Sequence, residues 1–263
     1  MKSRKDRDRR RHTTARRAIE ILRTLGEAGR PLGTSAIADR TGLPKATVHR
    51  LLKELEQADC LIFEEVGQVY RLGPALIQLG EQARAQWQLV NIARPTLEQL
   101  AAETGETVNL GVLHDDIVLV LDTVRDPGGP RLTVNLGPTA ELHCSAMGKA
   151  LLSALPPRRR DELLARITFT RRTVHTLQDP SALRHELELA AKEGLAYDRE
   201  ESELGLFCVG APIRDAQGFP VAAVSVSGPV TRLEGERLRH LHGSLQRAVE
   251  RLSALLAYNR PNS

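Results

Sequence analysis

Apolar residues recur at the three- and four-residue spacing of a helix in three short segments near the start of the chain. The first segment precedes a stretch rich in glycine and proline at 26–33, the second covers about 35–40, and the third covers 44–57. Two short β-forming runs separated by a polar turn follow at 61–73 and predict a hairpin. Three helices followed by a hairpin are typical of a winged helix-turn-helix, which places its second motif helix in the major groove of DNA.

The third predicted helix has two chemically different faces. Its apolar stripe consists of Val48, Leu51, Leu52 and Leu55. The opposite, cationic side consists of Lys45, Ala46, His49, Arg50 and Lys53. Pro44 lies in the first turn, where a proline loses no helical hydrogen bond. Because this turn reaches deepest into the groove, Thr47 is placed to meet a base edge and Arg50 a guanine or a phosphate. A solvated basic face is the simpler interpretation of an isolated helix, but the order of the elements around it favours DNA contact.

Beyond the hairpin the apolar pattern changes its period. A helical stretch from Pro74 to about residue 92 comes first, and Pro95 predicts a break before a further helix at 96–103. Five segments rich in β-forming residues follow, at 106–113, 116–124, 131–137, 207–215 and 218–228. Helical patterns lie among and after them, at 145–155, 159–166, 181–193 and 234–257. Two of the joints between strands are short enough for hairpins, so we expect an antiparallel sheet flanked by helices, which is an α+β fold.

Composition narrows the class of protein. The chain has 263 residues, of which 41% are hydrophobic, enough for the core of one large domain or two smaller ones. Aromatic residues make up only 3%, which argues against the base-stacking platforms of single-strand binders and favours duplex DNA. No apolar run approaches the roughly 18 residues of a membrane span, and no signal-peptide core follows the basic start, so we expect a cytoplasmic protein.

Positive charge is concentrated at the amino terminus. Residues 1–17 carry nine Lys or Arg and two Asp, a net charge of +7 in a chain whose total is +4, so the remainder is slightly acidic. Such an arm is either a solvated, disordered tail or a segment that contacts phosphates. Three cysteines, Cys60, Cys144 and Cys208, form no C-x-x-C pair, so we predict no structural zinc and no metal site.

A ligand site is predicted where a helix begins at Ser145, after a strand-like segment. The N–H groups and the positive dipole end at Ala146, Met147 and Gly148 suit a carboxylate. Lys149 adds charge nearby, although a lysine in the first turn of a helix is often simply exposed.

Two alternating serines form a second candidate feature. In AVSVSG, Ser225 and Ser227 face the same side of the sheet, where they are structural or orient a ligand. Cys208 lies in a neighbouring apolar segment, and a buried, inert cysteine is its simpler interpretation.

Catalysis is one alternative to binding. His143 and Cys144 suggest a nucleophile, and Asp198 with Glu200 and Glu201 suggests acid–base chemistry. Adjacent residues of a strand point to opposite faces, however, so His143 is not expected to activate Cys144. The chain has no P-loop, G-x-G-x-x-G or H-E-x-x-H motif, so we expect neither an enzyme nor a cofactor. A sensor that acts only through protein partners is a further alternative, and the cations of the third helix argue against it.

Several longer stretches resemble IclR-type bacterial transcription regulators. They are RRAIEIL (16–22), IADRTGLPKATVHRLLKELE (37–56), YRLGPALIQLG (70–80), AAETGETVNLGVL (101–113), LHCSAMGKALLSALP (142–156) and EGLAYDREESELGLFCVGAPIRDAQGFPVAAVSVSGP (193–229). The resemblance covers about residues 14–257. It implies an N-terminal winged helix-turn-helix, a helical linker and a C-terminal GAF-like effector domain with an antiparallel sheet flanked by helices. Such domains bind organic acids or aromatic catabolites.

The resemblance and the helix pattern together give the expected domains and sites. The domains are a basic disordered arm at 1–13, a winged helix-turn-helix at 14–73, a linker helix at 74–94 and a GAF-like effector domain at 95–258. DNA contacts are expected from Arg16, Arg17, Ser35, Pro44, Lys45, Ala46, Thr47, His49, Arg50, Lys53, Tyr70 and Arg71. Effector contacts are expected from Leu132, Ala146, Met147, Gly148, Asp198, Cys208, Ser225 and Ser227.

The same resemblance implies partners, and the helix predicted to run on from the hairpin suggests a mechanism. A homodimer or a dimer of dimers should bind an inverted repeat in double-stranded operator DNA, with RNA polymerase as a further partner. A small organic acid should shift the C-terminal domains, and the helix after Pro74 should carry that change to the DNA-binding heads. Whether the protein represses, activates or does both stays open at this point.

Overall fold

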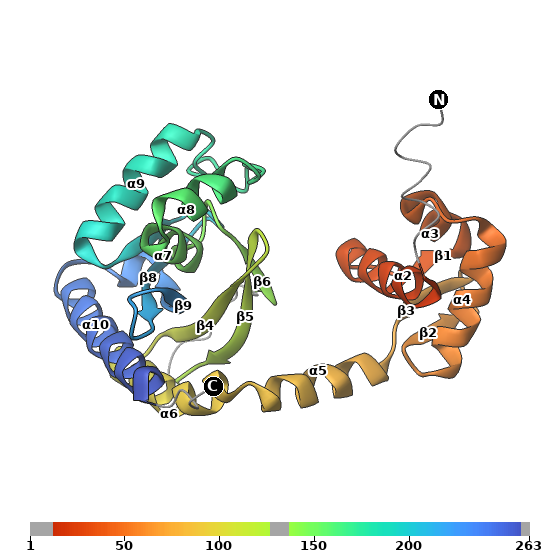
Figure 1. Cartoon of the computed structure of the whole chain (residues 1–263), viewed down its shortest axis with the longest axis horizontal. Helices are drawn as coiled ribbons and strands as arrows, with labels where there is room; N and C mark the ends of the chain where they lie inside the picture. The colour runs from red at the N-terminus through yellow and green to blue at the C-terminus, as the bar shows by residue number, and fades with distance from the viewer. Residues whose placement is uncertain (1–12, 127–136, 259–263) are drawn as a thin grey trace. The chain divides into compact units, whose positions relative to one another are not determined.

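The computed structural model describes residues 13–126 and 137–258, and the chain divides into two compact units between Gln86 and Trp87 (Figure 1). The predicted basic arm lies outside the described residues except for Thr13. Within the described ranges, no helix combines the length and the apolar character that a membrane crossing requires.

The first unit packs three helices against a small antiparallel sheet. The helices are α2 (Thr14–Ala28), α3 (Thr34–Thr41) and α4 (Lys45–Gln57), and the strands are β1 (Leu32–Gly33), β2 (Leu61–Glu64) and β3 (Val69–Leu72) in the order β1-β3-β2. The three predicted helices and the hairpin are confirmed. Left-handed glycines end the first two helices, since Gly29 and Gly42 have φ of 60° and 66° and turn their N–H groups back onto the last helical turn.

The core of this unit combines the apolar stripes of the three helices with one residue from each strand. It consists of Ile21, Leu25, Leu32, Ile37, Ala38, Val48, Leu51, Leu52, Leu61 and Tyr70. Because the stripes of all three helices converge on this core, their opposite faces are left toward solvent, and α4 accordingly exposes its cationic side.

Two helices follow the hairpin, and the break between them was predicted at the wrong place. The helix α5 (Pro74–Gln86) ends before Trp87, and α6 (Gln88–Thr104) continues through Pro95. A proline inside a helix costs about 3 kcal/mol or more. The helix α6 compensates for this cost by burying residues on both sides of the proline, namely Val90, Ala93, Thr96, Leu97, Leu100 and Ala101. The chain therefore has no continuous helix from the hairpin into the second unit.

The second unit contains a six-stranded antiparallel sheet. Its strands are β4 (Thr107–His114), β5 (Ile117–Val124), β6 (Thr139–Glu141), β7 (Ala196–Arg199), β8 (Leu206–Arg214) and β9 (Pro220–Pro229), in the order β6-β5-β4-β9-β8-β7. The hairpins β4–β5 and β8–β9 confirm the predicted short joints. The edge strands β6 and β7 were not predicted, because runs of three or four residues carry little periodicity. The predicted strand at 131–137 lies outside the described residues except for Gly137.

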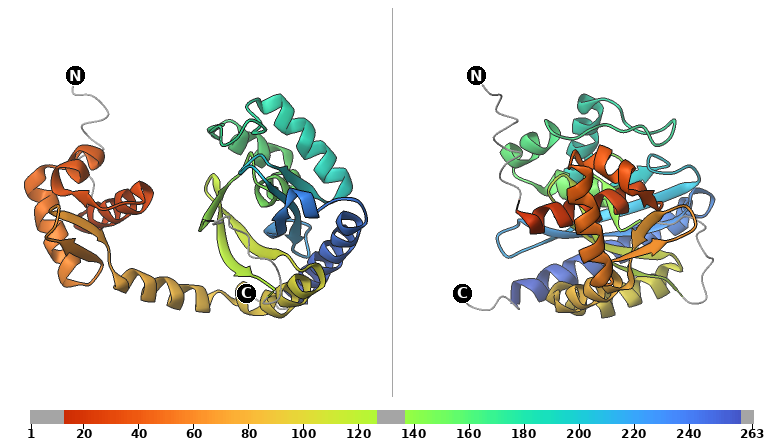
Figure 2. Two further views of the ribbon diagram at one scale, coloured as in Figure 1. Left: turned by 180° about the vertical axis from the view of Figure 1, so that it is seen from behind. Right: turned by 90° about the vertical axis from the view of Figure 1, so that its right-hand side faces the viewer.

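Helices cover both faces of this sheet (Figures 1 and 2). One face carries α6 and α10 (Gly235–Tyr258), which share an apolar core with β4, β8 and β9. The other face carries α7 (Ala146–Ala154), α8 (Pro157–Leu164) and α9 (Pro180–Glu193), with a separate apolar core that includes Leu151, Leu163 and Leu187. A short 3-10 helix, η1 (Val230–Arg232), precedes α10. The α+β class with an antiparallel sheet is confirmed.

Candidate nucleic-acid interface and ligand pocket

The helix α4 separates its two faces as its sequence predicts. Val48, Leu51 and Leu52 are buried in the core, whereas the cationic side is exposed along its whole length. The exposed residues of that side are Lys45, Ala46, His49, Arg50 and Lys53. Pro44 is exposed as the N-cap residue, just before the first turn, and Thr47 is half-buried. The amino-terminal end of α4 thus offers small groups and hydrogen-bond donors on one open surface.

Two of these cations already have acidic partners on the same helix. Arg50 Nη1 lies 2.8 Å from Glu54 Oε1, and Lys53 Nζ lies 3.3 Å from Glu56 Oε2. The side chains of Arg50 and Glu54 are 57% and 53% exposed. Ion pairs with this exposure contribute at most about 1 kcal/mol. Arg50 can therefore exchange its carboxylate for a phosphate or a base at little cost.

Other residues assigned to DNA contact fall into different environments. Arg16, Ser35 and Arg71 are exposed, and Arg71 Nε is held 2.8 Å from Glu64 Oε1 across the hairpin. Arg17 is half-buried.

The assignment of Tyr70 to DNA contact needs correction. This residue is 3% exposed, and its ring packs against Phe63 with centroids 4.9 Å apart. Phe63 lies directly opposite Tyr70 in the β2–β3 register, so both rings serve the core of the hairpin. A buried ring of this kind stabilises the unit and presents no surface to DNA.

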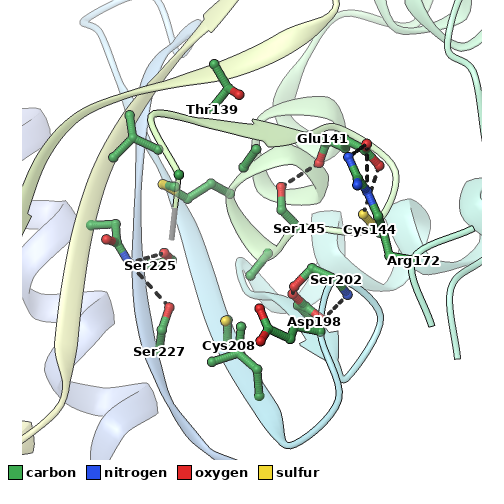
Figure 3. Close-up of a pocket in the computed structure, with 18 of the residues that line it drawn as sticks. Thr139, Glu141, Cys144, Ser145, Arg172, Asp198, Ser202, Cys208, Ser225 and Ser227 are labelled. Atoms are coloured by element: carbon green, nitrogen blue, oxygen red, sulfur yellow. Dashed lines mark hydrogen bonds and ion pairs between the residues drawn. The ribbon is translucent and has the colours of Figure 1, made fainter. Parts of the chain in front are cut away.

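In the second unit a pocket of about 440 Å³ opens between the sheet and the start of α7 (Figure 3). Ser225 and Ser227 of β9 lie on one side of it, as the alternation of the strand predicts. Asn109 of β4 joins them: its Nδ2 donates to Ser227 Oγ at 3.3 Å and to Ser225 Oγ at 3.5 Å. Thr123 in turn donates to Asn109 Oδ1 at 3.0 Å, which fixes the orientation of the amide. The result is a buried polar wall with two hydroxyls that a ligand can reach.

Asp198 of β7 lies at the same pocket and is 1% exposed. Its Oδ1 accepts from the backbone N–H groups of Glu201 and Ser202 at 2.8 and 3.2 Å, and its Oδ2 accepts from the Ser202 hydroxyl. Burial raises the pKa of Asp198 to about 6, and the bonds from Ser202 oppose that shift only in part. Its register partner Cys208 is buried as well, and burial raises the pKa of that thiol, which is therefore neutral.

The start of α7 supplies fewer ligand donors than the sequence suggests. Ala146 and Met147 line the pocket, and as the first two residues of the helix their N–H groups have no acceptor within it. The N–H of Gly148 instead donates to the N-cap Ser145 Oγ at 3.1 Å. Gly148 does not line the pocket, since it packs on Leu142, where an added Cβ would lie 2.6 Å from Cα. Its assignment to the effector is thus corrected to a packing role.

Lys149 is neither exposed nor part of the pocket lining. It is 1% exposed, and its Nζ lies 2.6 Å from Glu201 Oε1 and 3.9 Å from Glu186 Oε2. This buried ion pair ties α7 to the turn after β7, whose N–H groups hold Asp198. The expected contribution of Lys149 to a carboxylate seat is replaced by a role in holding that turn.

The sequence did not reveal several residues that line the pocket. Glu141, Arg172 and Ser202 come from separate segments, and Arg172 Nε donates to Glu141 Oε1 at 2.9 Å. Nothing in the sequence around Arg172 marks it, because its partner is 31 residues away. Asn109 was more accessible to prediction, because an amide within the apolar strand ETVNLGVL is unusual. Leu132, which was assigned to the effector, lies outside the described residues.

The segment before α7 also differs from its prediction. Residues 142–144 form a turn and not a strand, so His143 and Cys144 do not point in opposite directions. Their ligating atoms and a Glu141 carboxylate oxygen all lie within 4.8 Å of one another. Burial and the neighbouring Glu141 carboxylate raise the pKa of the Cys144 thiol, which makes it a weak nucleophile.

Both halves of the chain match one family. Residues 14–61 match the IclR helix-turn-helix domain, and residues 82–254 match the C-terminal domain of the bacterial transcriptional regulator IclR. The glycerol operon regulatory protein of Streptomyces coelicolor is 37% identical over 242 residues, which cover 89% of this chain and 94% of that protein. The transcriptional repressor IclR of Escherichia coli is 31% identical over 246 residues, with 92% and 88% covered.

The fold matches as well. The crystal structure of an IclR homolog from Microbacterium hydrocarbonoxydans complexed with 4-hydroxybenzoate superposes with a TM-score of 0.75. The match covers 94% of this chain and 100% of that one, at 24% sequence identity. The matched proteins are transcription regulators and not enzymes, as expected. The chain therefore belongs to the IclR family of bacterial transcriptional regulators.

Proposed function

We propose that this protein senses a small organic acid in the pocket of its second unit and changes its affinity for operator DNA in response. The observation that carries the proposal is the two-faced helix α4, whose apolar side is buried while its whole cationic side is open. Phosphate contacts by such a side supply affinity, and contacts to base edges supply sequence preference. DNA binding places this activity in the cytoplasm.

The pocket suits an aromatic or other compact carboxylic acid. Its volume of about 440 Å³ lies in the range of small-molecule sites. Ile117, Val120 and Met147 offer apolar contacts, and Ser225 and Ser227 offer hydroxyls. A carboxylate oriented toward the first N–H groups of α7 would also meet the positive end of that helix. Support comes from the homolog that was crystallised with 4-hydroxybenzoate, an aromatic acid of this size.

Asp198 adds a condition on such a ligand. A carboxylate beside an ionised, buried Asp198 would be repelled, and among the described residues that line the pocket the one arginine, Arg172, is already bonded to Glu141. Asp198 accommodates an acid either by holding a proton or by accepting a hydrogen bond from a hydroxyl group of the ligand. The pKa of about 6 makes both states accessible near neutral pH.

The proposed assembly is a homodimer or a dimer of dimers on an inverted repeat. Two copies of α4 would then occupy major grooves about one helical turn apart, or a multiple of it. The proposed working units are a basic arm at 1–13, a winged helix-turn-helix at 14–73, a linker at 74–94 and an effector domain at 95–258. Contact with RNA polymerase is the corresponding proposal for activation. The effector response has to pass through the joint at Trp87, where α5 ends.

The proposal is tested by ligand and DNA binding in one preparation. A panel of aromatic and small aliphatic acids is screened by thermal unfolding, because a ligand present at 100 times its Kd stabilises the native fold by about 2.7 kcal/mol. Duplexes selected from a random pool are then titrated with the protein, with and without the stabilising acid. We expect the acid to change the Kd for the selected duplex at least fivefold. The double variant Ser225→Ala, Ser227→Ala should bind the same duplex but lose the response.

Two outcomes would overturn the proposal. One is a random pool from which no duplex is enriched. The other is an acid that stabilises the protein but leaves its affinity for DNA unchanged.

A further inference from the structure

Three potential metal ligands of different chemistry meet at the wall of the pocket. Glu141 Oε2 lies 3.5 Å from Cys144 Sγ and 3.7 Å from His143 Nε2. All three ligating atoms lie within 4.8 Å of one another. Zinc bonds of about 2.0–2.3 Å in a tetrahedral arrangement place neighbouring ligand atoms roughly 3.3–3.6 Å apart. The two pairs that include Glu141 are therefore close to the spacing that a single ion requires, and Cys144 Sγ and a His143 ring nitrogen lie within 4.8 Å of each other.

The backbone holds these residues in place without a metal. The strand β6 ends at Glu141, and the chain turns through His143 and Cys144 into α7. Ser145 closes this turn, because its N–H and its hydroxyl both donate to the Glu141 carbonyl, at 3.2 and 2.6 Å. Gly148 allows α7 to approach the turn closely at Leu142. An ion would bind to a turn that is already ordered, so little ordering cost opposes its binding.

An ion pair orients Glu141, and ring packing restrains His143. Arg172 occupies Glu141 Oε1, which leaves Oε2 directed toward the cysteine and the histidine. The His143 ring packs against Phe169 with centroids 5.3 Å apart, and its Nε2 lies 3.1 Å from the Thr170 carbonyl. Ion binding at Nε2 would replace that hydrogen bond and leave the ring proton on Nδ1. The bond from Arg172 to Glu141 is an outer contact of the kind that fixes the geometry of metal ligands, whereas the bond from His143 to Thr170 would be lost.

Charge also suits a divalent ion. His143 and Cys144 are buried, and Glu141 is partly buried, so an ion here sits in an environment that tolerates little net charge. A thiolate and a carboxylate together offset the two positive charges of the ion, with the thiol proton released to solvent on binding. The Arg172 guanidinium, which is bonded to Glu141, leaves one positive charge beside the site, and this charge suits an anionic ligand. The combination of thiolate, imidazole and carboxylate favours zinc over magnesium or calcium, which prefer oxygen ligands.

We propose that Glu141, His143 and Cys144 form a three-residue binding site for a zinc ion whose fourth position faces the pocket. Glu141 and Cys144 line the cavity, and Figure 3 shows both beside Arg172 on the side away from Ser225 and Ser227. The open position would take a water molecule or an oxygen of an acidic ligand. The second of these options rests on the proposed effector function, whereas the metal site itself does not.

Cobalt titration of the full chain tests this site without DNA or an effector. Co²⁺ replaces Zn²⁺ in tetrahedral sites and gives a near-ultraviolet charge-transfer band only when a thiolate is bound. After treatment with a chelator, the protein should bind one equivalent of Co²⁺ with that band, and Zn²⁺ should then displace it. Cys144→Ser should abolish the band, and His143→Gln should weaken binding by more than about 100-fold, since even outer-shell partners contribute about 10–100-fold.

Two further cysteines provide matched controls. Cys60 lies half-buried in the first unit, and Cys208 lies elsewhere in the same pocket. Cys60→Ser and Cys208→Ser should both keep the cobalt band. A band that persists in Cys144→Ser, a band lost in Cys208→Ser, or no band at all would overturn the proposal. If the proposal is overturned in this way, the trio is a hydrogen-bonded cluster that closes the turn. Unfolding midpoints in the presence of chelator confirm that each variant is folded.

Discussion

The two units place their candidate functional groups in opposite environments. In the first unit, Lys45, His49 and Arg50 stand in solvent on one face of a helix. In the second, Asp198, Lys149 and Ser227 are each 1% exposed and sit among buried partners. An exposed cation is hydrated and ready to exchange partners, whereas a buried charge must be matched by a fixed neighbour. The first unit can therefore lose one of these exposed charged groups with little effect on its fold, whereas the second unit cannot lose one of its buried charged groups in the same way.

The largest effect is expected at the buried ion pair. Lys149→Ala leaves Glu201 buried without its cation, and breaking one partner of a buried pair costs about 3–5 kcal/mol. Denaturant unfolding of the second unit should show this loss. The double variant Lys149→Met, Glu201→Leu removes both charges and should recover most of the stability. A single variant that loses less than about 1 kcal/mol would show that the pair is hydrated and that the two units do not differ in this respect.

A second large effect is expected from pH at Asp198. Burial raises the pKa of this carboxyl to about 6 from an ordinary 3.8. The folded protein then keeps a proton that the unfolded chain loses, so stability falls as pH rises from about 4 to about 6, by roughly 3 kcal/mol in total. Below this window both states are protonated, and the penalty is absent.

Asp198→Asn isolates this contribution. An amide oxygen can still accept from the two backbone N–H groups, and its NH₂ can donate to the Ser202 hydroxyl. The free energy of unfolding, measured between pH 4 and pH 6.5, should fall less steeply in the variant than in the parent protein. Parallel curves would show that water reaches Asp198 and that its pKa is close to the ordinary value.

A moderate effect is expected on DNA binding from Arg50. Arg50→Ala should weaken binding to a selected duplex by about 1–3 kcal/mol if the guanidinium reads a base. Fluorescence anisotropy with a selected and a random duplex distinguishes the two roles, because an equal loss on both assigns Arg50 to the phosphate backbone. Arg239→Ala on α10 is a matched control, since that side chain is 71% exposed and lies in the other unit. It should leave DNA affinity unchanged.

The smallest effect is expected at the partner of Arg50. Glu54→Gln breaks an exposed ion pair, and pairs of this spacing on a helix contribute about 0.3–0.5 kcal/mol. The free energy of unfolding should therefore change by no more than that amount, in contrast with Lys149→Ala. A loss of several kcal/mol would mean that the face of α4 is structural, and it would remove the contrast between the units.

The first unit was largely predictable because its information is local. The stripe of Val48, Leu51 and Leu52 defines the inner face of α4 by spacing alone, and Gly29 and Gly42 mark the ends of helices. Tyr70 was misassigned because a tyrosine in a strand of a hairpin suits both a core and a surface. Only its register opposite Phe63 decides between the two.

The second unit was predictable in its strands and helices but less so in its chemistry. The alternation of Ser225 and Ser227 is a local pattern, and it placed both hydroxyls correctly on one face. Lys149 was not recognised as buried, because its partner Glu201 is 52 residues away. The helix through Pro95 shows the same limit, since burial on both sides of the proline outweighs a local rule. Polar groups brought together by tertiary contacts leave no periodic signal in the sequence.

The helix α5 has thirteen residues and not one buried side chain, and it ends where the two units divide. Isolated helices of this length are barely stable in water, so α5 should interconvert with coil even while both flanking cores remain folded. Segments that unwind in this way are where proteases cut. Brief digestion with trypsin, which cleaves after Arg84, should therefore release two resistant fragments.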